Sequence, residues 1–131
     1  MPYSPLAAGH LTRPTWHTDT HRSKTDRVAM GKYDRTESQD MQIVSRVAAL
    51  AKQYGVNMQQ IALAWHWAKG VASPIVGATK SYYLDDAVNA LSIKLTDADL
   101  AYLEELYVPQ RIIGAIDHTP ADGVMLLDEK K

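Results

Sequence analysis

The chain has 131 residues, 46% of them apolar, and a formal net charge of −1. This size allows one globular domain with a core and is too small for two ordinary domains. The near-neutral charge argues against a nucleic-acid or anionic-membrane partner, and no apolar run approaches the roughly 20 residues of a membrane span. The absence of cysteine excludes disulfides and thiolate chemistry. Together with an N-terminus that lacks a secretory pattern, it favours a cytoplasmic protein.

The first nine residues predict a short extended segment that turns at once, because two prolines within five residues bar a helix. Residues 10–35 follow without hydrophobic periodicity and carry more basic than acidic side chains. Connections of this length without regular structure are unusual, and they are commonly functional or disordered. The charge of this segment favours an anionic ligand over a cationic one.

Two amphipathic helices are predicted next, joined as an αα-hairpin. Thr36-Glu-Ser-Gln39 is a capping-box pattern that opens the first helix, which ends before Gly55. Asn57-Met-Gln-Gln60 repeats this opening for the second helix, which ends at Gly70. Apolar residues at helical spacing give each helix one buried face. They are Ile43, Val44, Val47, Leu50, Ala51 and Tyr54 in the first helix, and Ile61, Ala64, Trp65 and Ala68 in the second.

The apolar run from Val71 to Val76 predicts a parallel strand buried under helices, since it is rich in β-branched residues and too short for a helix. Gly77-Ala-Thr79 then turns the chain into a third helix, and Thr96-Asp-Ala-Asp99 caps a fourth. The residues expected on the buried faces are Leu84, Val88 and Leu91 in the third helix, and Leu100, Leu103 and Leu106 in the fourth.

The turn Gly77-Ala-Thr-Lys-Ser81 is a candidate phosphate site. Backbone N–H groups at a helix start, two hydroxyls and the Lys80 ammonium could all face one anion. The alternative is structural: the glycine lets the strand turn, and Ser81 caps the helix. Neither a Walker A loop nor a GxGxxG fingerprint is present to decide between them. Asp86 lies one turn inside the helix, where it is either a solvated side chain or a contact for a sugar or base.

Other chemistry-bearing residues carry weaker signals. His66 is expected to be a packed or partly solvated side chain rather than a ligand. Three histidines and Asp19 lie within residues 10–21, but their spacing matches no familiar zinc site, so we predict no metal. Trp65 and Trp67 cannot both face the core, so one is expected to cover a surface that another element or chain covers. No hydrolytic triad or pair of catalytic carboxylates can be recognised.

Five segments resemble the aldo-keto reductase family and occur in that family's order. They are Pro2–Arg13, Arg22–Asp26, Ile61–Trp65, Pro74–Lys80 and Tyr107–Pro109. The family folds as a (β/α)8 barrel and transfers a hydride from NADPH to a carbonyl. The resemblance therefore implies an α/β, mostly helical chain that forms the last two βα units of a TIM barrel and its closing helix. Residues 1–114 would make this portion, with 10–35 as a loop over the cofactor and 115–131 as an irregular tail.

The resemblance also implies which residues near the N-terminus hold NADPH. Ser4, Leu6 and Gly9 fall in the loop that holds the pyrophosphate. Arg13 matches a basic residue beside the phosphates, and Arg22 matches a loop arginine that closes over the adenosine end.

A second set of implied contacts surrounds the predicted third helix. Thr79 matches a contact to the 2′-phosphate, while Tyr83 replaces an arginine or glutamine that is frequent in the family. We expect Lys80 to compensate, which leaves the preference for NADP over NAD open. Asp86 matches a position near the adenine, and Ala87 replaces a common asparagine.

The family's catalytic tyrosine, aspartate, lysine and histidine have no counterpart here. We therefore predict no catalytic residue and no activity of the isolated chain, and a carbonyl substrate only if the missing N-terminal part completes the barrel. Two strands leave open edges, which favour self-association. The alternatives are a noncatalytic nucleotide-binding or interaction module and a remnant without a role. The missing first part of the barrel is compatible with a truncated reading frame, a split gene or an expressed fragment.

Overall fold

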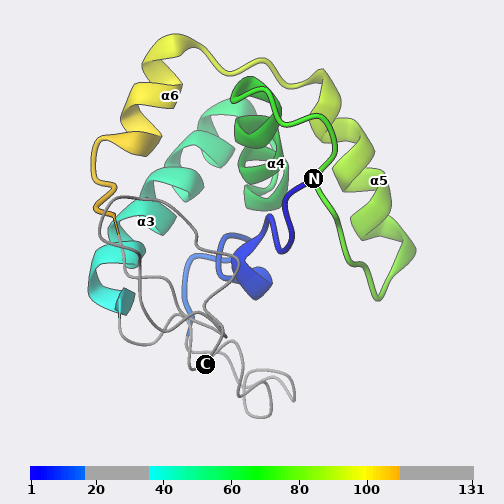
Figure 1. Cartoon of the computed structure of the whole chain (residues 1–131), viewed down its shortest axis with the longest axis horizontal. Coiled ribbons are helices and arrows are strands. Elements are labelled where there is room, and N and C mark those ends of the chain that lie inside the picture. Colours follow the sequence, from blue (N-terminus) through cyan, green and yellow to red (C-terminus); the bar gives the residue numbers. More distant parts are fainter. Residues whose placement is uncertain (17–35, 110–131) are drawn as a thin grey trace, which may run out of the picture.

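A computed structural model describes residues 1–16 and 36–109 of the chain, and this part is mostly helical, as expected (Figure 1). In chain order the elements are the 3-10 helix η1 (Ala7–Gly9), α3 (Glu37–Tyr54), α4 (Met58–Ala68), α5 (Ser81–Asn89), the 3-10 helix η3 (Ala90–Ser92) and α6 (Asp97–Glu104). Figure 1 shows α4 between α3 and α5. Within the described ranges, no helix is both long and apolar enough to cross a bilayer.

The helix ends follow from local capping. Asn57 accepts from the Gln60 N–H at 3.0 Å while the Gln60 side chain accepts from the Asn57 N–H, so the predicted capping box opens α4. The pattern at Thr96 also forms a capping box and opens α6. At the other ends, Gly55 and Gly70 adopt φ of 67° and 78°, the left-handed conformation in which glycine ends helices.

The capping box expected at Thr36 does not form, although α3 begins where predicted. Thr36 makes no capping hydrogen bond to the backbone, and its hydroxyl donates to Asp40 Oδ2 at 2.5 Å. Glu37 and Asp40 still place negative charge in the first turn, where it stabilises the helix dipole. The start of α3 therefore depends on charge and packing rather than on the predicted cap.

The core lies between α3, α4 and α6. Ile61 and Leu63 of α4 are fully buried, and Leu103 of α6 closes one side. Leu11 and Trp16 from the N-terminal segment pack against this cluster. The buried members of the cluster are Val44, Val47, Leu50, Ala51, Met58, Ile61 and Leu103, which confirms the buried face predicted for α3. Of the face predicted for α6 only Leu103 is buried, and Ala68, predicted on the buried face of α4, is exposed.

The predicted buried strand at residues 71–76 is wrong in its extent and its burial. The structure shows an isolated parallel bridge between Tyr3 and Ile75, with the Ile75 N–H donating to the Pro2 carbonyl at 3.1 Å. The two extended segments thus lie side by side, as expected. Ile75 is nevertheless 51% exposed, because nothing among the described residues covers this face of the pairing.

The expected buried face of the third predicted helix is also wrong. This helix is α5, and none of its residues is buried. Leu84, Val88 and Leu91 are 51%, 64% and 54% exposed. Leu84 and Val88 lie one turn apart in α5, whereas Leu91 lies beyond it in η3 and lines a cavity with Trp67 of α4.

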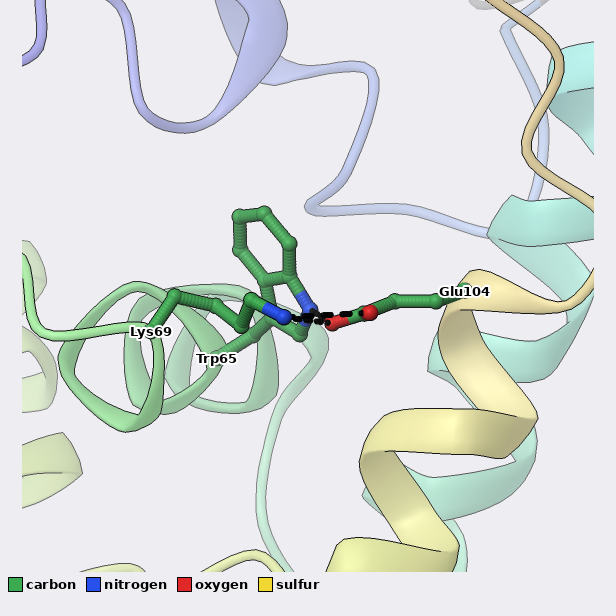
Figure 2. A network of polar contacts seen from close by, with 3 residues as sticks. All are labelled: Trp65, Lys69 and Glu104. Carbon is green, nitrogen blue, oxygen red and sulfur yellow. Dashed lines mark hydrogen bonds and ion pairs between the residues drawn. The ribbon is translucent and has the colours of Figure 1, made fainter.

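A polar network joins α4 to α6 (Figure 2). Trp65 Nε1 donates to Glu104 Oε1 at 2.8 Å, and Lys69 Nζ lies 3.1 Å from the same carboxylate. These contacts lower the pKa of Glu104, the Lys69 hydrogen bond most of all. Trp67 points elsewhere and lines a cavity of about 450 Å³ with Leu91, Ile93 and Leu95, among others. The two tryptophans therefore diverge, as predicted.

Candidate functional site

The N-terminal segment is a series of tight turns with unusual backbone conformations. Ser4, Ala7 and Ala8 have φ of 56°, 49° and 54°, in the left-handed region that non-glycine residues rarely adopt, and Gly9 has φ of 96°. Each such residue costs about 1–3 kcal/mol, and strain of this kind is concentrated at ligand clamps and switch regions. Three such residues within five positions identify this segment as a candidate binding loop.

Most backbone N–H groups of this segment already have partners within it. The Ala7 N–H donates to the Ser4 carbonyl at 3.0 Å, and the Ala8 N–H donates to Ser4 Oγ at 3.2 Å. Gly9 donates to the Leu6 carbonyl at 2.9 Å. An anion bound by Ser4, Leu6 and Gly9 would have to replace some of these bonds, so side chains are the better donors here.

Arg13 supplies such a side chain, and Gly9 leaves room for it. A Cβ on Gly9 would lie 3.1 Å from Arg13 Nη2, which is tighter than an ordinary contact. The absence of a side chain at Gly9 thus permits both the positive φ of this residue and the close approach of the guanidinium. The Thr12 hydroxyl donates to the Gly9 carbonyl at 2.7 Å and fixes the turn between them.

The second candidate segment is the start of α5. Lys80, not Ser81, is the N-cap residue, and it makes no side-chain capping bond, so the structural role expected of Ser81 is wrong. Thr79 and Lys80 are exposed. Nothing lies within 4 Å of a Cβ built on Gly77, so there is open space on that side of the turn. The turn is therefore accessible to a ligand.

Two adjacent tyrosines, Tyr82 and Tyr83, lie beside Lys80. The rings of Tyr82 and Tyr83 lie 4.4 Å apart, and Lys80 Nζ lies 5.6 Å from the Tyr82 ring centroid. Hydrogen bonding between the two hydroxyls lowers the pKa of Tyr82 and raises that of Tyr83. The charges of Lys80 and Arg13 both act on Tyr83 and lower its pKa, against the larger effect of Tyr82. Lys80 thus lies beside this pair of phenols, and Arg13 is near enough for its charge to act on one of them.

The side chains of α4 hold both segments in place. His66 Nε2 lies 2.9 Å from the Pro5 carbonyl, which ties the N-terminal turns to α4. Gln59 Nε2 donates to the Tyr83 carbonyl at 2.8 Å, which ties α5 to the same helix. Gln59 is only 6% exposed. The prediction that His66 is a packed side chain is therefore confirmed. Its contact with Pro5 helps to position the candidate site.

The structure brings together some of the predicted site residues. Lys80 lies beside the Tyr82 ring, Arg13 and Lys80 are near enough to Tyr83 for their charges to lower its pKa, and Asp86 is near enough to Tyr82 to raise the Tyr82 pKa. Sequence reasoning missed Tyr82 and Gln59. The adjacent pair of tyrosines was a signal for the first, and a buried glutamine just inside a capped helix has no comparable signature in sequence.

Some predicted residues lie outside the described ranges. These are Arg22, most of the loop assigned to residues 10–35, the zinc candidates beyond residue 16, and the tail at 115–131. Within the described ranges, no group of three histidine or carboxylate side chains could hold a metal ion.

A family model described as "Aldo/keto reductase family" matches residues 1–108. Versiconal hemiacetal acetate reductase of Aspergillus parasiticus is 38% identical over 113 residues, which cover 86% of this chain and 33% of that protein. A putative aryl-alcohol dehydrogenase of Schizosaccharomyces pombe is 44% identical over 120 residues, 88% of this chain and 32% of that protein.

The similarity extends to further fungal proteins. An aldo-keto reductase of Fusarium vanettenii is 35% identical over 115 residues, covering 87% of this chain and 30% of that protein. The chain thus spans about a third of the length of the curated relatives it matches.

Proposed function

This chain belongs to the aldo/keto reductase family, and on that premise we propose that it forms the cofactor-binding part of an NADPH-dependent carbonyl reductase. The family implies a TIM-barrel fold and a reaction on carbonyl compounds. The observation that supports the cofactor role is the exposed Lys80 ammonium 5.6 Å from the Tyr82 ring centroid at the start of α5, with Arg13 near enough for its charge to act on the Tyr83 pKa. Two cations and two hydroxyls from separate segments form a site with the charge and donors that phosphates require.

We assign the residues to two parts of the dinucleotide. The N-terminal turns, with Ser4, Leu6, Gly9 and Arg13, would hold the pyrophosphate mainly through the guanidinium. Bound NADPH would supply the hydride for carbonyl reduction, while this chain's own residues bind and orient it.

The start of α5 would hold the adenosine end. Lys80 would pair with the 2′-phosphate, with Gly77 and Thr79 in the same turn, and Asp86 would face the sugar or base. The Tyr83 hydroxyl would donate a hydrogen bond to a phosphate oxygen. The 2′-phosphate is the group that separates NADPH from NADH, so Lys80 is the residue on which discrimination between them depends.

Removing either cation is expected to weaken NADPH binding. Lys80→Ala and Arg13→Gln should each raise the dissociation constant about tenfold or more, since a hydrogen bond to a charged group is worth about 1.5–3 kcal/mol. Lys80→Ala should affect NADPH more than NADH, which has no 2′-phosphate. Titration calorimetry of the full chain with both dinucleotides measures this.

Lys52→Ala is the matched control, because Lys52 is an exposed lysine in the last turn of α3. It should bind NADPH like the unchanged chain. Equal effects of Lys80→Ala on both dinucleotides would contradict the 2′-phosphate assignment. A chain that binds neither dinucleotide would overturn the proposed function.

We expect no turnover from the chain alone, because active sites of TIM barrels are assembled from loops after several different strands. The measurement is NADPH oxidation at 340 nm with an aromatic aldehyde. Aldehyde-dependent oxidation above the rate of a heat-denatured sample would contradict this expectation. A noncatalytic nucleotide-binding or interaction module remains the second candidate, and the exposed face of α5 favours its interaction role. The cytoplasmic location stays a prediction from the sequence.

A further inference from the structure

Tyr82 presents a phenol to solvent in the first turn of α5. It is 48% exposed, and Figure 1 shows α5 at the edge of the described part of the chain. The chain contains no cysteine, so no thiolate, an intrinsically stronger nucleophile, competes with its phenols. A phenol reacts as a nucleophile mainly through its anion, so its reactivity depends on how readily it ionises. The neighbours of Tyr82 therefore decide whether it reacts.

Lys80 and Tyr83 favour the ionised form of the Tyr82 phenol. Lys80 Nζ lies 5.6 Å from the Tyr82 ring centroid, within the range at which a cation interacts with an aromatic ring. The Tyr83 ring lies 4.4 Å away, and its hydroxyl hydrogen-bonds the Tyr82 hydroxyl. Both a positive charge and a donated hydrogen bond stabilise a phenolate. Asp86 and desolvation act in the opposite direction, yet the pKa of Tyr82 lies below its ordinary value of 10.0, with the Tyr83 hydrogen bond as the largest cause.

The contacts of Tyr83 make Tyr82 the member of the pair that ionises first. Gln59 Nε2 donates to the Tyr83 carbonyl at 2.8 Å and ties this residue to α4. Its hydroxyl donates to the Tyr82 oxygen, which raises the pKa of Tyr83. The charges of Lys80 and Arg13 lower the Tyr83 pKa by less. Coupled groups lose their protons in two steps, and the first step here leaves the negative charge on the Tyr82 oxygen.

We propose that Tyr82 is a nucleophilic phenol and a site of covalent modification by sulfonyl and acyl electrophiles that carry a good leaving group. With a sulfonyl fluoride, the Tyr82 oxygen attacks the sulfur, and an S–O bond forms as the S–F bond breaks. Fluoride leaves with the electron pair, and the hydroxyl proton passes to water. The Lys80 ammonium stabilises the oxygen anion before the attack. This inference goes beyond the proposed function, because the reaction needs no dinucleotide.

The test treats the full 131-residue chain with phenylmethanesulfonyl fluoride at neutral pH and maps the modified residues by peptide mass spectrometry over time. Tyr82 should be sulfonylated about threefold or more faster than Tyr102, because the rate follows the fraction of phenolate. Tyr102 is the matched internal control. It is 40% exposed and has the Arg46 guanidinium 4.5 Å from its ring centroid, but no tyrosine adjoins it in the sequence.

Removing the hydroxyl of Tyr83 should slow the modification of Tyr82. Tyr83→Phe keeps the ring and the backbone carbonyl that Gln59 bonds, and should lower the Tyr82 rate about threefold or more. Tyr102→Phe is the control variant and should leave that rate unchanged. In the folded chain the Tyr82 rate should also rise at a lower pH than in the urea-unfolded chain, where these neighbours are lost. Circular dichroism checks that the helices of both variants persist.

Equal rates at Tyr82 and Tyr102 would overturn the inference, as would an unchanged Tyr82 rate in Tyr83→Phe. A sulfonamide on Lys80 in place of the ester on Tyr82 would also overturn it. A second reagent, fluorosulfonylbenzoyl adenosine, separates this inference from the proposed function, which expects the adenosine end at the start of α5. If the plain reagent modifies Tyr82, but adenosine does not speed the reaction and NADPH does not slow it, the proposed function fails and this inference stands.

Discussion

Replacing Ile61 by alanine is expected to lower the free energy of unfolding by about 2–5 kcal/mol. Ile61 is fully buried in α4, in the middle of the cluster shared with α3 and α6. Alanine would remove three carbon atoms and leave a cavity that the surrounding helices can fill only partly. Because small domains are stable by only about 5–15 kcal/mol, this is a large fraction of the total.

Urea denaturation followed by circular dichroism measures the loss at Ile61. Ile75→Ala is the matched control, since Ile75 carries the same side chain but is 51% exposed. Its effect should stay below about 1 kcal/mol. Equal losses at the two positions would show that the core does not lie between α3, α4 and α6.

The Ile61 variant should also weaken NADPH binding at temperatures where it is partly unfolded. The reason is that α4 holds both candidate segments, through His66 at the Pro5 carbonyl and Gln59 at the Tyr83 carbonyl. Binding measured well below the unfolding transition should be nearly unchanged. That result would show that the site depends on this helix for position rather than for direct contacts.

Replacing Asp99 by asparagine is expected to cost about 1–3 kcal/mol at neutral pH. The Asp99 carboxylate accepts from the Tyr54 hydroxyl at 2.5 Å, the Thr96 hydroxyl at 2.7 Å and the Thr96 N–H at 2.9 Å. It thereby closes the capping box of α6 and joins this helix to the end of α3. Asparagine keeps the shape but loses the charge that makes these bonds strong.

The same variant should change how stability depends on pH. The Tyr54 hydroxyl, more than any other contact, lowers the pKa of Asp99 below its ordinary value of 3.8. A lowered carboxyl pKa contributes stability that is present above 3.8 and is lost as pH falls through the folded-state pKa. The unchanged chain should therefore lose stability on acidification through this range, and Asp99→Asn should lose less.

Tyr54 should make stability depend on pH in the alkaline range. Donation to Asp99 raises the Tyr54 pKa above 10.0, so its contribution is present below pH 10.0 and lost as pH rises through the folded-state pKa. Tyr54→Phe is the control, because it should remove the alkaline loss and leave Asp99 bonded to Thr96. Urea unfolding at a series of pH values measures both the acid and the alkaline loss of stability. Identical acid profiles for Asp99→Asn and the unchanged chain would contradict this account.

Local rules explain the parts of the fold that sequence reasoning predicted well. The capping boxes at Asn57 and Thr96 and the glycine at residue 55 act within a few residues of themselves, so their patterns set where helices begin and end. The buried face of α3 follows from apolar spacing in the same way. The exception is Thr36, whose hydroxyl donates to Asp40 Oδ2 and accepts no capping hydrogen bond from the backbone.

The candidate site could be predicted only in part. The resemblance to a family identified Arg13 and Lys80 separately, but the placement of their two segments on the same side of α4 depends on contacts between residues far apart in the chain. Gln59 and His66, which make that placement possible, look like ordinary helix residues in the sequence. Such contacts follow from packing, which periodicity does not encode.

By itself, the sequence determined which segments are helical, where most of them stop, and which family the chain resembles. The tertiary structure decided that Leu84, Val88 and Leu91 lie open to solvent and that the extended run at Ile75 pairs at one bridge only. The physical reason is that an apolar pattern states which face of an element favours burial, whereas burial itself requires a second surface. That surface has to come from residues distant in the chain or from another molecule.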